Sequence, residues 1–345
     1  MTVSGSLRTW RPLLLGLAAL ALLAPASALA CGPYIPLDGD MELDRERGIV
    51  IWDGTTEQSL MELAVTGDAS EAAWLFPSPT PATVELGSSS TFDQLGDLTR
   101  PQIVIEHRPG WPSFAGGAAA PPEGIGGGVN VLSRQTLGPF EVTTLAADES
   151  GALLGWLTEN GYALPPELGA VLRPYVEQGW YYVAVKLRPE TQGEALSGQL
   201  DPLWIRFEAS EPVYTMRAMA TSRAAVPLTL YVFADHRVQK SAAFGQSEIA
   251  YADWVDPADL PAGSAVAPRL PGRLFLTKFS ESIDPSLVND DYVFRFAAQD
   301  EVYHETITQV EYDDYTWLLG LCCCALLLAV GAAGAAVVVR RRRRV

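Results

Sequence analysis

Cysteine is scarce in this sequence. Only four of its 345 residues are cysteines, and three of them, Cys322, Cys323 and Cys324, are adjacent near the carboxyl end. A disulfide requires Cα atoms about 4.4–6.8 Å apart in a suitable orientation, which adjacent residues do not easily reach. The rest of the chain holds Cys31 alone. The sequence therefore predicts a domain without disulfides, which depends on its hydrophobic core for stability.

Basic residues are also few once both ends of the chain are set aside. Of the 24 lysines and arginines, two lie in the first 30 residues and five in the last six, so the remaining 17 stand against all 41 acidic residues. The net charge of this middle region is −24. Such a surface repels phosphate backbones. We therefore expect a well-solvated domain and no nucleic-acid partner.

Recognisable catalytic and cofactor motifs are missing from the sequence. The pattern His304-Glu305-x-x-Thr308 begins like a zinc-protease helix, but Thr308 replaces the second histidine. The segment 109–128 is rich in glycine and proline yet lacks the Lys-Ser/Thr of a phosphate-binding loop, and no Gly-x-Ser-x-Gly elbow occurs. We predict no cofactor, no metal and no catalytic residue, and we interpret 109–128 as a mobile loop.

Two weaker patterns leave alternatives open. Asp290 and Asp291 could bind calcium, but no EF-hand spacing surrounds them, and a turn explains adjacent acidic residues equally well. Trp180, Tyr181 and Tyr182 could form a carbohydrate platform. Because successive side chains of a strand point to opposite faces, at most two of the three share a surface, and we favour core packing for this run.

The first 30 residues have the parts of a secretory signal peptide. Arg8 and Arg11 form a basic region, residues 13–24 form an apolar stretch, and Ala28-Leu29-Ala30 supplies the small residues of a cleavage site. The apolar stretch is shorter than the roughly 20 residues that a membrane-spanning helix requires. We therefore predict that residues 1–30 are removed during export.

Cleavage after Ala30 would leave Cys31 at the start of the mature chain, where lipoproteins are acylated. The lipoprotein motif prefers Leu three positions before its cysteine. Here Ala28 holds that position and Leu29 follows it. We favour a free thiol at Cys31 and keep lipidation as the alternative.

Near the carboxyl end, residues 318–339 contain no charged side chain. A helix of that length, rising 1.5 Å per residue, is about 33 Å long and matches the roughly 30 Å hydrocarbon core of a bilayer. The small residues of 329–336 would allow close helix–helix approach, or they simply fill a lone anchor. A stop-transfer cluster follows, consisting of Arg340, Arg341, Arg342, Arg343 and Arg344.

Arginine clusters stay on the cytoplasmic side of a membrane. The sequence therefore predicts a single-pass protein that contacts the lipid bilayer through residues 318–339, with residues 340–345 in the cytoplasm. The domain 31–313 would then lie outside, in the periplasm or at the cell surface. This topology agrees with the predicted signal peptide.

The cysteine triplet allows a second interpretation of the tail. A cysteine motif, a hydrophobic span and an arginine cluster, in this order, resemble the myxobacterial type of carboxyl-terminal sorting signal, in which the cysteine is processed. The resemblance covers only the tail, and Gly320-Leu321 before the triplet departs from the pattern. We favour an anchor, with Cys31, Cys322, Cys323 and Cys324 as candidate lipidation or processing sites.

Between the signal peptide and the tail, most segments have strand patterns. The run 47–54 ends in Asp-Gly, a pair that favours hairpin turns. Prolines at 77, 79 and 81 predict that the segment before them does not continue there as a central strand. Further apolar or alternating segments lie at 60–65, 72–76, 101–109, 180–189, 201–209, 226–235, 272–279 and 291–297.

Two helices are predicted in the middle of the chain. The first follows Asp148 and ends near Gly161, and the second covers 165–179, with Pro174 expected to kink or divide it. Strands on both sides of these helices indicate an α+β fold. We expect a mainly antiparallel β domain with a central helical pair, in one lobe or two, plus one transmembrane helix.

Several segments resemble a known bacterial family. Cys31-Gly32, "AWLFPSP" (73–79), the stretch 138–187 and "PLWIRFEASEPVYTMRA" (202–218) are similar to the domain of unknown function 2330. The similarity spans most of residues 31–310. It implies an exported, often membrane-tethered bacterial protein without an assigned activity, and it offers no catalytic residue that could be carried over.

We therefore interpret the chain as an exported envelope protein, most simply a non-enzymatic binding or structural module whose partner is another envelope protein or a polymer. The alternative is an exported hydrolase whose site is assembled from residues far apart in the sequence. A deep pocket that gathers a histidine and two acids would favour the hydrolase.

Overall fold

The computed structural model describes residues 34–109, 140–146, 155, 157–159, 168–189, 194–313 and 316–342. The chain divides into two compact units, Met1–Thr99 with Arg134–Tyr303, and Arg100–Ser133 with His304–Val345. The predicted signal peptide, Cys31 and most of the predicted loop 109–128 lie outside the described residues.

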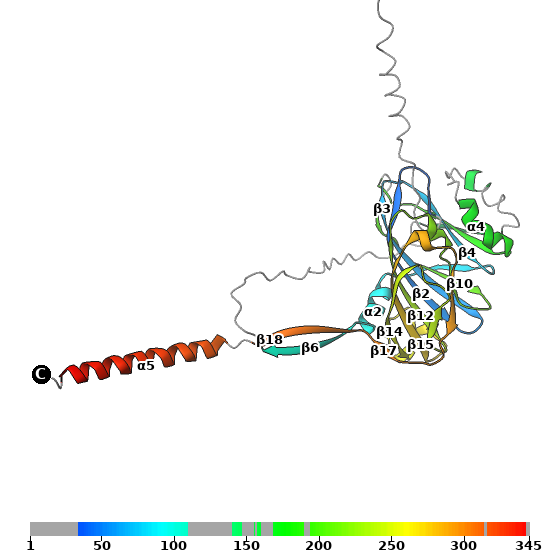
Figure 1. Cartoon of the computed structure of the whole chain (residues 1–345). Helices are drawn as coiled ribbons and strands as arrows, with labels where there is room; N and C mark the ends of the chain where they lie inside the picture. The colour runs from blue at the N-terminus through cyan, green and yellow to red at the C-terminus, as the bar shows by residue number, and fades with distance from the viewer. Residues whose placement is uncertain are drawn as a thin grey trace, which may run out of the picture. The chain divides into compact units, whose positions relative to one another are not determined.

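A large mixed sheet forms the centre of the first unit (Figure 1). Most of its strand pairs are antiparallel, and the central pair of β12 with β2 is parallel. In spatial order the strands are β17 (Tyr303–His304), β14 (Gly245–Val255), β15 (Leu274–Ile283), β12 (Val226–Ala234), β2 (Met41–Trp52), β3 (Thr56–Gly67), β10 (Leu203–Glu208) and β5 (Thr83–Leu86), and β9 (Gly198–Gln199) also pairs with β3.

The predicted hairpin at Asp53-Gly54 joins β2 to β3. The carboxylate of Asp53 accepts hydrogen bonds from the backbone N–H groups of Thr55 and Thr56, at 3.0 and 2.7 Å, which fixes the turn. Along β2 the side chains alternate between two hydrophobic clusters, Ile49 and Ile51 on one face and Val50 and Trp52 on the other. Both faces of the sheet are therefore covered.

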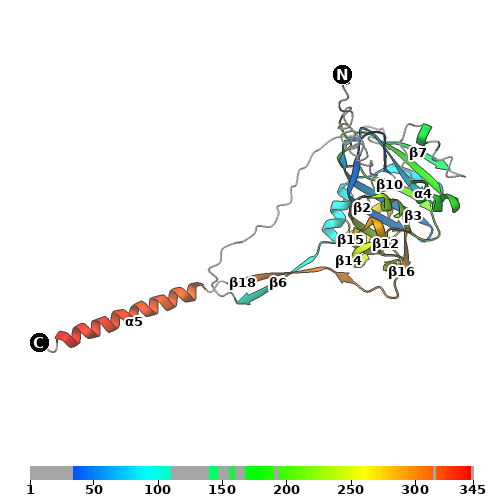
Figure 2. The same ribbon diagram turned by 45° about the horizontal axis from the view of Figure 1, so that its top comes forward.

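A second, antiparallel sheet packs against one face of the large sheet (Figure 2). It contains β1 (Tyr34–Pro36), β4 (Ala72–Ser78), β8 (Tyr181–Leu187) and β7 (Phe140–Ala146) in that order. Trp74 and Phe76 of β4 and Val183 and Val185 of β8 share the central core with residues of the large sheet. The two sheets thus form a sandwich.

Pro77 lies at the end of β4, which was predicted not to continue as a central strand through the prolines. It is still inside β4, opposite Tyr182 of β8, and the strand ends at Ser78. The other neighbour, β1, pairs only with residues 72–74 of β4. At Pro77 the strand is therefore an edge on that side, where the missing N–H of proline breaks no ladder hydrogen bond.

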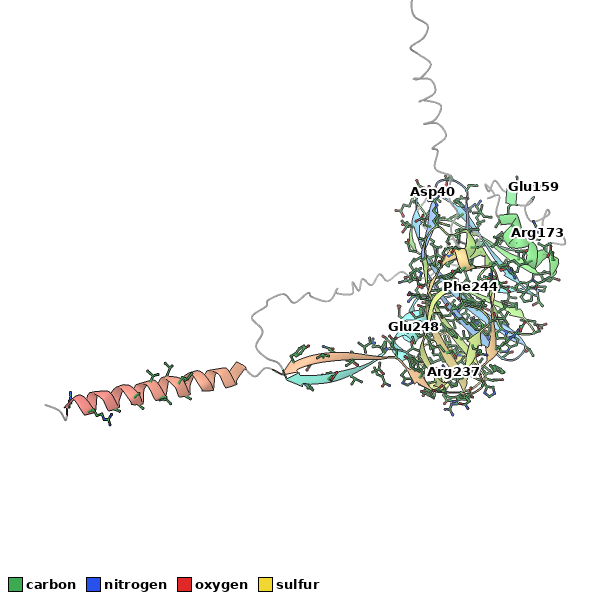
Figure 3. All side chains as sticks on the ribbon, in the orientation of Figure 1. Asp40, Glu159, Arg173, Arg237, Phe244 and Glu248 are labelled. Atoms are coloured by element: carbon green, nitrogen blue, oxygen red, sulfur yellow. The ribbon has the colours of Figure 1, made fainter. Side chains whose placement is uncertain are left out.

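A small third sheet completes the first unit, with β11 (Val213–Tyr214), β16 (Tyr292–Phe296) and β13 (Val238–Lys240) in that order. Short 3-10 turns lie in the connections between strands of this unit: η1 (Arg217–Thr221), η2 (Pro257–Asp259), η3 (Ala267–Arg269) and η4 (Pro285–Leu287). Phe244 lies in the middle of the unit in Figure 3, and its ring stacks on Tyr292 at 5.0 Å.

Helices cover the outer face of each sheet. α4 (Leu168–Glu177) packs Leu168, Leu172 and Tyr175 on the four-stranded sheet, and it continues through Pro174 without being divided. Residues 155 and 157–159 of the first predicted helix are helical, and the remainder of that helix lies outside the described residues. The observed fold is mainly β with few helices, as predicted.

The sequence interpretation missed α2 (Ser90–Leu98), which covers the large sheet with Phe92 and Leu95. The signal was present in the sequence. A run of serines precedes Phe92, and Phe92, Leu95 and Leu98 recur every three residues, which is the spacing of one helical face.

The second unit contains two strands and a helix. β6 (Gln102–Pro109) and β18 (Thr306–Asp313) lie side by side as a parallel pair, and α5 covers Thr316–Arg342. β6 lies within the predicted segment 101–109, whereas β18 was not among the predicted strand segments. Across the part of the chain that the structure describes, no helix satisfies the joint requirement of length and hydropathy for crossing a bilayer.

Candidate ligand-binding site

A surface pocket of about 250 Å³ lies in the first unit. It is bordered by the turn after α4, the end of β10, β11 and the start of β16, and its lining includes Trp180, Glu211, Val213, Arg217 and Asp290. These residues are far apart in the sequence, so the fold brings them together. The pocket combines an aromatic wall with charged side chains.

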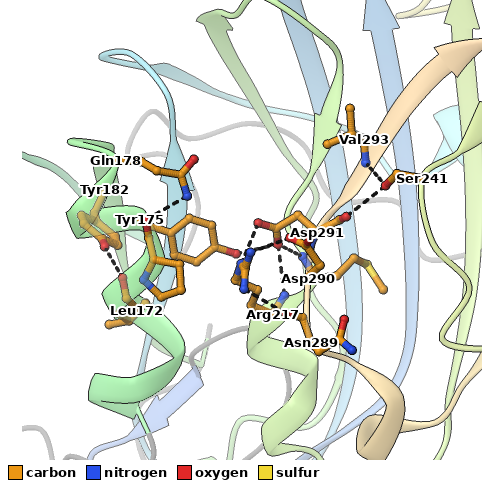
Figure 4. Close-up of polar contacts among 12 residues, drawn as sticks. Leu172, Tyr175, Gln178, Tyr182, Arg217, Ser241, Asn289, Asp290, Asp291 and Val293 are labelled. Carbon is orange, nitrogen blue, oxygen red and sulfur yellow. Dashed lines mark hydrogen bonds and ion pairs between the residues drawn. The ribbon is translucent and has the colours of Figure 1, made fainter.

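A buried carboxylate holds the floor of this pocket together. Oδ1 of Asp291 accepts hydrogen bonds from the Tyr175 hydroxyl at 2.7 Å and from the backbone N–H groups of Met216 and Arg217 at 2.7 and 3.2 Å. Figure 4 shows Tyr175 pointing from α4 toward Asp291. Asp291 therefore links α4, η1 and β16 to one another.

The guanidinium of Arg217 is surrounded by acceptors. Its Nε donates to Oδ2 of Asp291 at 3.3 Å, its Nη1 donates to the carbonyl oxygen of Asn289 at 2.9 Å, and its Nη2 donates to Asp290 (Figure 4). Asp290 also accepts the backbone N–H of Asp291 at 2.8 Å. These contacts engage both oxygens of Asp291 and Oδ1 of Asp290, the two carboxylates of the calcium interpretation.

Burial changes the titration of this network. Removal from water raises the pKa of Asp291, although its bonds to Tyr175, to the backbone and to Arg217 act in the opposite direction. Burial, together with the neighbouring Asp291 carboxylate, holds the pKa of Tyr175 well above its ordinary value. Tyr175 therefore remains a hydroxyl donor at every physiological pH.

Two further carboxyl groups fix β11, which forms one wall of the pocket. The Tyr214 hydroxyl donates to Glu46 of β2, and the Val213 N–H donates to Glu57 of β3 at 2.8 Å. Both glutamates are fully buried, and burial raises their pKa values, to about 7 for Glu46 and about 8 for Glu57. At neutral pH Glu57 is therefore largely protonated and Glu46 about half protonated, and both side chains anchor β11.

A buried ion pair lies behind β16. Lys240 contacts Glu281, and the Tyr292 hydroxyl donates to the same carboxylate at 2.8 Å. The Lys240 ammonium also lies 4.3 Å from the centroid of the Tyr292 ring. Burial lowers the pKa of Lys240, and the nearby Glu281 opposes this effect. Asp291 and Tyr292 are neighbours, so β16 is held by a polar network on each side.

The aromatic run 180–182 is divided between core and pocket. Tyr182 is fully buried, and its hydroxyl donates to the carbonyl oxygen of Leu172 at 3.2 Å. Trp180 is half-buried, lines the pocket and packs against the Tyr175 ring at 5.2 Å. The preference for core packing therefore holds for Tyr182, whereas Trp180 also faces the pocket.

The residues predicted as lipidation, processing or stop-transfer sites do not line the pocket where the structure describes them. Cys31 is outside the described residues, Cys322 and Cys323 lie within α5, and Cys324 is a free, exposed thiol. α5 includes Arg340, Arg341 and Arg342, while Arg343 and Arg344 follow the last described residue. None of these positions belongs to the pocket, and their predicted roles remain predictions.

The histidines do not enter the pocket. Nδ1 of His236 lies 2.8 Å from Asp300 at the surface, and Nδ1 of His304 lies 2.9 Å from the Gln102 amide. His304 and Thr308 lie in strands, not in the helix that a zinc-protease pattern requires. Among the described residues, no group of three His, Cys, Asp or Glu side chains is placed to hold a metal ion.

Sequence reasoning identified Asp290, Asp291 and Trp180 but missed Arg217, Tyr175, Glu46 and Glu57. Asp291 and Arg217 are 74 residues apart, so no local motif joins them. The buried glutamates carry a weak signal, because an acidic residue inside an apolar strand must find a hydrogen-bond donor.

A family model described as "Uncharacterized protein conserved in bacteria (DUF2330)" matches residues 25–295. This match confirms the resemblance drawn from the sequence; the sorting signal in the tail is not tested by it. No curated protein matches the chain. The crystal structure of baculovirus P35 is similar to 76% of this chain and 99% of its own, with 9% identity and a TM-score of 0.39. That likeness is too weak to support an argument.

Proposed function

The chain belongs to the DUF2330 family of uncharacterized proteins conserved in bacteria, and we propose that it is an exported, single-pass membrane protein whose β-rich domain is a non-enzymatic binding module. The ligand would be a cationic group on another envelope protein or polymer, held in the pocket beside Trp180 and Arg217. The signal peptide, the anchor at 318–339 and the cytoplasmic arginines complete this proposal.

The anchor is supported by the sequence of the tail. Residues 318–339 carry no charge, and five arginines follow directly. Transferring such a segment from water into hydrocarbon is favourable, whereas the arginine side chains resist translocation. The strongly acidic domain between the two ends repels anionic headgroups, which suits a domain that stands off the membrane surface.

The pairing of Arg217 is the observation that carries the binding proposal. Its donors are used by Asp290, Asp291 and the Asn289 carbonyl, so its positive charge is already neutralised inside the protein. Glu211 and the half-exposed Asp290 leave the rim of the pocket with a negative excess. The face of Trp180 adds the aromatic surface on which ammonium and guanidinium groups bind well.

This arrangement suits holding a ligand rather than transforming one. The floor carboxylate, Asp291, accepts four hydrogen bonds from Tyr175, Met216 and Arg217, and Tyr175 is a donor of very high pKa. A general base must be able to accept a proton from the substrate. The oxygens of Asp291 instead accept hydrogen bonds that hold α4 and η1 in place, so we expect a rigid pocket.

The anchor is tested by comparing the full chain with a variant that ends at Asp313, both expressed with their signal peptide in a bacterium. We expect the full chain to remain in membranes washed with alkaline carbonate and the truncated chain to be released as a soluble exported protein. Equal release of both chains would contradict the anchor.

Ligand binding is tested by calorimetric titration of the detergent-solubilised full chain with an oligolysine peptide, and with an oligoglutamate peptide as the opposite charge. We expect Glu211→Gln and Trp180→Ala to weaken oligolysine binding severalfold. Glu248→Gln removes the same charge from an exposed site on β14 and is the matched control. Equal loss in Glu211→Gln and Glu248→Gln would reduce the effect to overall charge and contradict a specific pocket.

A further inference from the structure

The parallel pair β6–β18 presents an apolar face to solvent. Ile103 and Ile105 lie two residues apart on β6 and therefore share one face, and Ile307 pairs with Ile103 across the ribbon. The exposed fractions of Ile103, Ile105 and Ile307 are 63%, 49% and 51%. Gln309 and the pair His107–Glu311 continue this face toward the carboxyl ends of the strands. We call it the isoleucine face.

A two-stranded parallel ribbon of this kind lacks the cover that parallel strands normally have. Parallel sheets occur almost only where both faces are packed, and an isolated two-stranded unit is at best marginally stable in water. The opposite face carries Val104, Val310 and Tyr312, but each of these pairs with a polar residue across the ribbon. On the isoleucine face, Ile103 and Ile307 pair with each other and adjoin Ile105, so this face has the larger continuous apolar patch and is the better candidate for a packing surface.

We propose that this partner is a second copy of the chain, packed isoleucine face to isoleucine face in a two-fold dimer. The inference rests on the proposed anchor. Two copies inserted in the same membrane with the same orientation can be related only by an axis along the membrane normal. β18 ends at Asp313 and α5 begins at Thr316, so in both copies the ribbon strands run toward the membrane.

This symmetry makes the isoleucine face complementary to itself. Rotation about an axis parallel to the strands places β6 of one copy opposite β18 of the other, at the same level. Because Ile103 pairs in register with Ile307, and His107 with Glu311, Ile103 then meets Ile307 of the second copy. In the same way His107 meets Glu311 of the second copy, an imidazole opposite a carboxylate. The interface would therefore consist of isoleucine contacts, followed toward the carboxyl ends of the strands by two equivalent His107–Glu311 contacts.

The helix that follows is compatible with the same dimer. Ala325, Ala329 and Ala333 recur every four residues and so lie on one side of α5. Small residues in this spacing let two membrane helices approach closely. Confinement of both anchors in one membrane also raises the effective concentration of the ribbons, which favours a small interface.

Photo-cross-linking in membranes tests the orientation of the ribbon. A benzophenone amino acid is placed at Ile105 or at Val104 of the otherwise native full chain. The two positions are adjacent, equally exposed at 49%, and on opposite faces. We expect a dimer-sized product from position 105 and little from position 104. Equal products from both positions, or only internal cross-links from 105, would overturn the isoleucine-face dimer.

The mass of the solubilised chain provides a second, independent readout. Light scattering in a non-ionic detergent should give two chains for the wild type and for Thr308→Lys, and one chain for Ile307→Lys. Unfolding of the β-rich unit should be the same in all three, because the ribbon belongs to the other unit. A wild-type monomer, or a dimer that survives Ile307→Lys, would contradict the proposal.

Different results would contradict the proposed anchor and the proposed dimer. The same membranes are washed with alkaline carbonate before irradiation. Loss of the chain in the wash contradicts the anchor and, with it, the symmetry on which this dimer depends. Retention of the chain without a dimer-sized product at 105 contradicts the dimer alone.

Discussion

Two strand pairs of this molecule differ in what covers them. In the hairpin β2–β3, Ile49, Val50 and Ile51 are fully buried, because helix α2 lies on one face and a second sheet on the other. In the ribbon β6–β18, Ile103 and Ile105 are half exposed or more. Both pairs contain the run Ile-Val-Ile, at 49–51 in β2 and at 103–105 in β6. Composition alone therefore does not determine whether a strand is buried.

The difference shows where the stability of this chain resides. The hairpin is local, with a turn fixed by Asp53, and it carries carboxyl groups that anchor other strands. The ribbon joins segments about 200 residues apart and buries little apolar surface of its own. The β-rich unit therefore has a core of its own, whereas the ribbon leaves its apolar side chains exposed.

The largest expected effect comes from the floor of the pocket. Asp291→Ala leaves Tyr175, Arg217 and two backbone N–H groups without their acceptor, and removing one member of a buried ion pair costs about 3–5 kcal/mol. Asp290→Ala removes the neighbouring carboxylate, whose side chain is 63% exposed, and should cost less than about 1 kcal/mol. Urea unfolding of the full chain in detergent, followed by tryptophan fluorescence, measures both. Similar losses would refute the central role of Asp291.

Substituting one isoleucine in each strand pair tests the comparison between the hairpin and the ribbon directly. Ile51→Ala creates a cavity in the core and should lower the free energy of unfolding of the β-rich unit by about 2–5 kcal/mol. Ile105→Ala should change that unit by no more than about 0.5 kcal/mol, because the side chain is exposed and belongs to the other unit. The same urea titration applies. A large loss in Ile105→Ala would show that the ribbon is part of the core.

The buried glutamates predict how stability depends on pH. Folding raises the pKa of Glu57 from 4.5 to about 8, so the folded state binds more protons than the unfolded state between these values. Stability should therefore fall as the pH rises from 5 to 8, by up to about 1.4 kcal/mol per pH unit. Unfolding titrations at pH 5, 6.5 and 8 should show a smaller decline in Glu57→Gln.

Glu71 supplies a control of opposite sign. A hydrogen bond from Lys186 lowers the pKa of Glu71, so its contribution is present above the ordinary value of 4.5 and is lost in acid. Glu71→Gln should therefore lower stability by a constant amount above about pH 5, with the difference vanishing in acid, and leave the slope of the decline between pH 5 and 8 intact. If Glu71→Gln and Glu57→Gln changed the slope over the same pH range, the assignment of the decline to Glu57 would be wrong.

The smallest expected effect is at an exposed ion pair. Arg223 lies 3.4 Å from Glu42, and both side chains are largely exposed. Solvent screens such pairs, and Arg223→Ala should lower stability by no more than about 0.5 kcal/mol. Raising the salt concentration should remove even this difference. A loss comparable with that of Asp291→Ala would undermine the distinction between buried and exposed polar contacts.

Much of the strand layout could be predicted from the sequence, since local patterns determine it. The run 47–54 ends in Asp-Gly and forms the hairpin, and the apolar segments at 181–187 and 226–234 are strands. That Pro77 itself still lies in β4 was not predictable, because it depends on how far β1 extends along β4, which no local pattern specifies. α2 was overlooked although its spacing of Phe92, Leu95 and Leu98 was visible.

The candidate site was only partly predictable. Asp291 was recognised as an acidic residue near a turn, but its partners Tyr175 and Arg217 come from an outer helix and a 3-10 turn far away in the sequence. Burial likewise determines the raised pKa values of Glu46 and Glu57, and burial follows from the packing of two sheets. Local sequence patterns contain no information about such convergence.

The central claim is that an exported β-rich domain is tethered by residues 318–339. Labelling with a membrane-impermeant maleimide tests it most directly, in a chain without its four native cysteines that carries either Gln246→Cys or Val345→Cys. In intact cells with a permeabilised outer membrane, position 246 should be labelled and position 345 should react only after lysis. Labelling of position 345 from outside, or an unlabelled position 246 in a cytosolic chain that retains residues 1–30, would contradict the account.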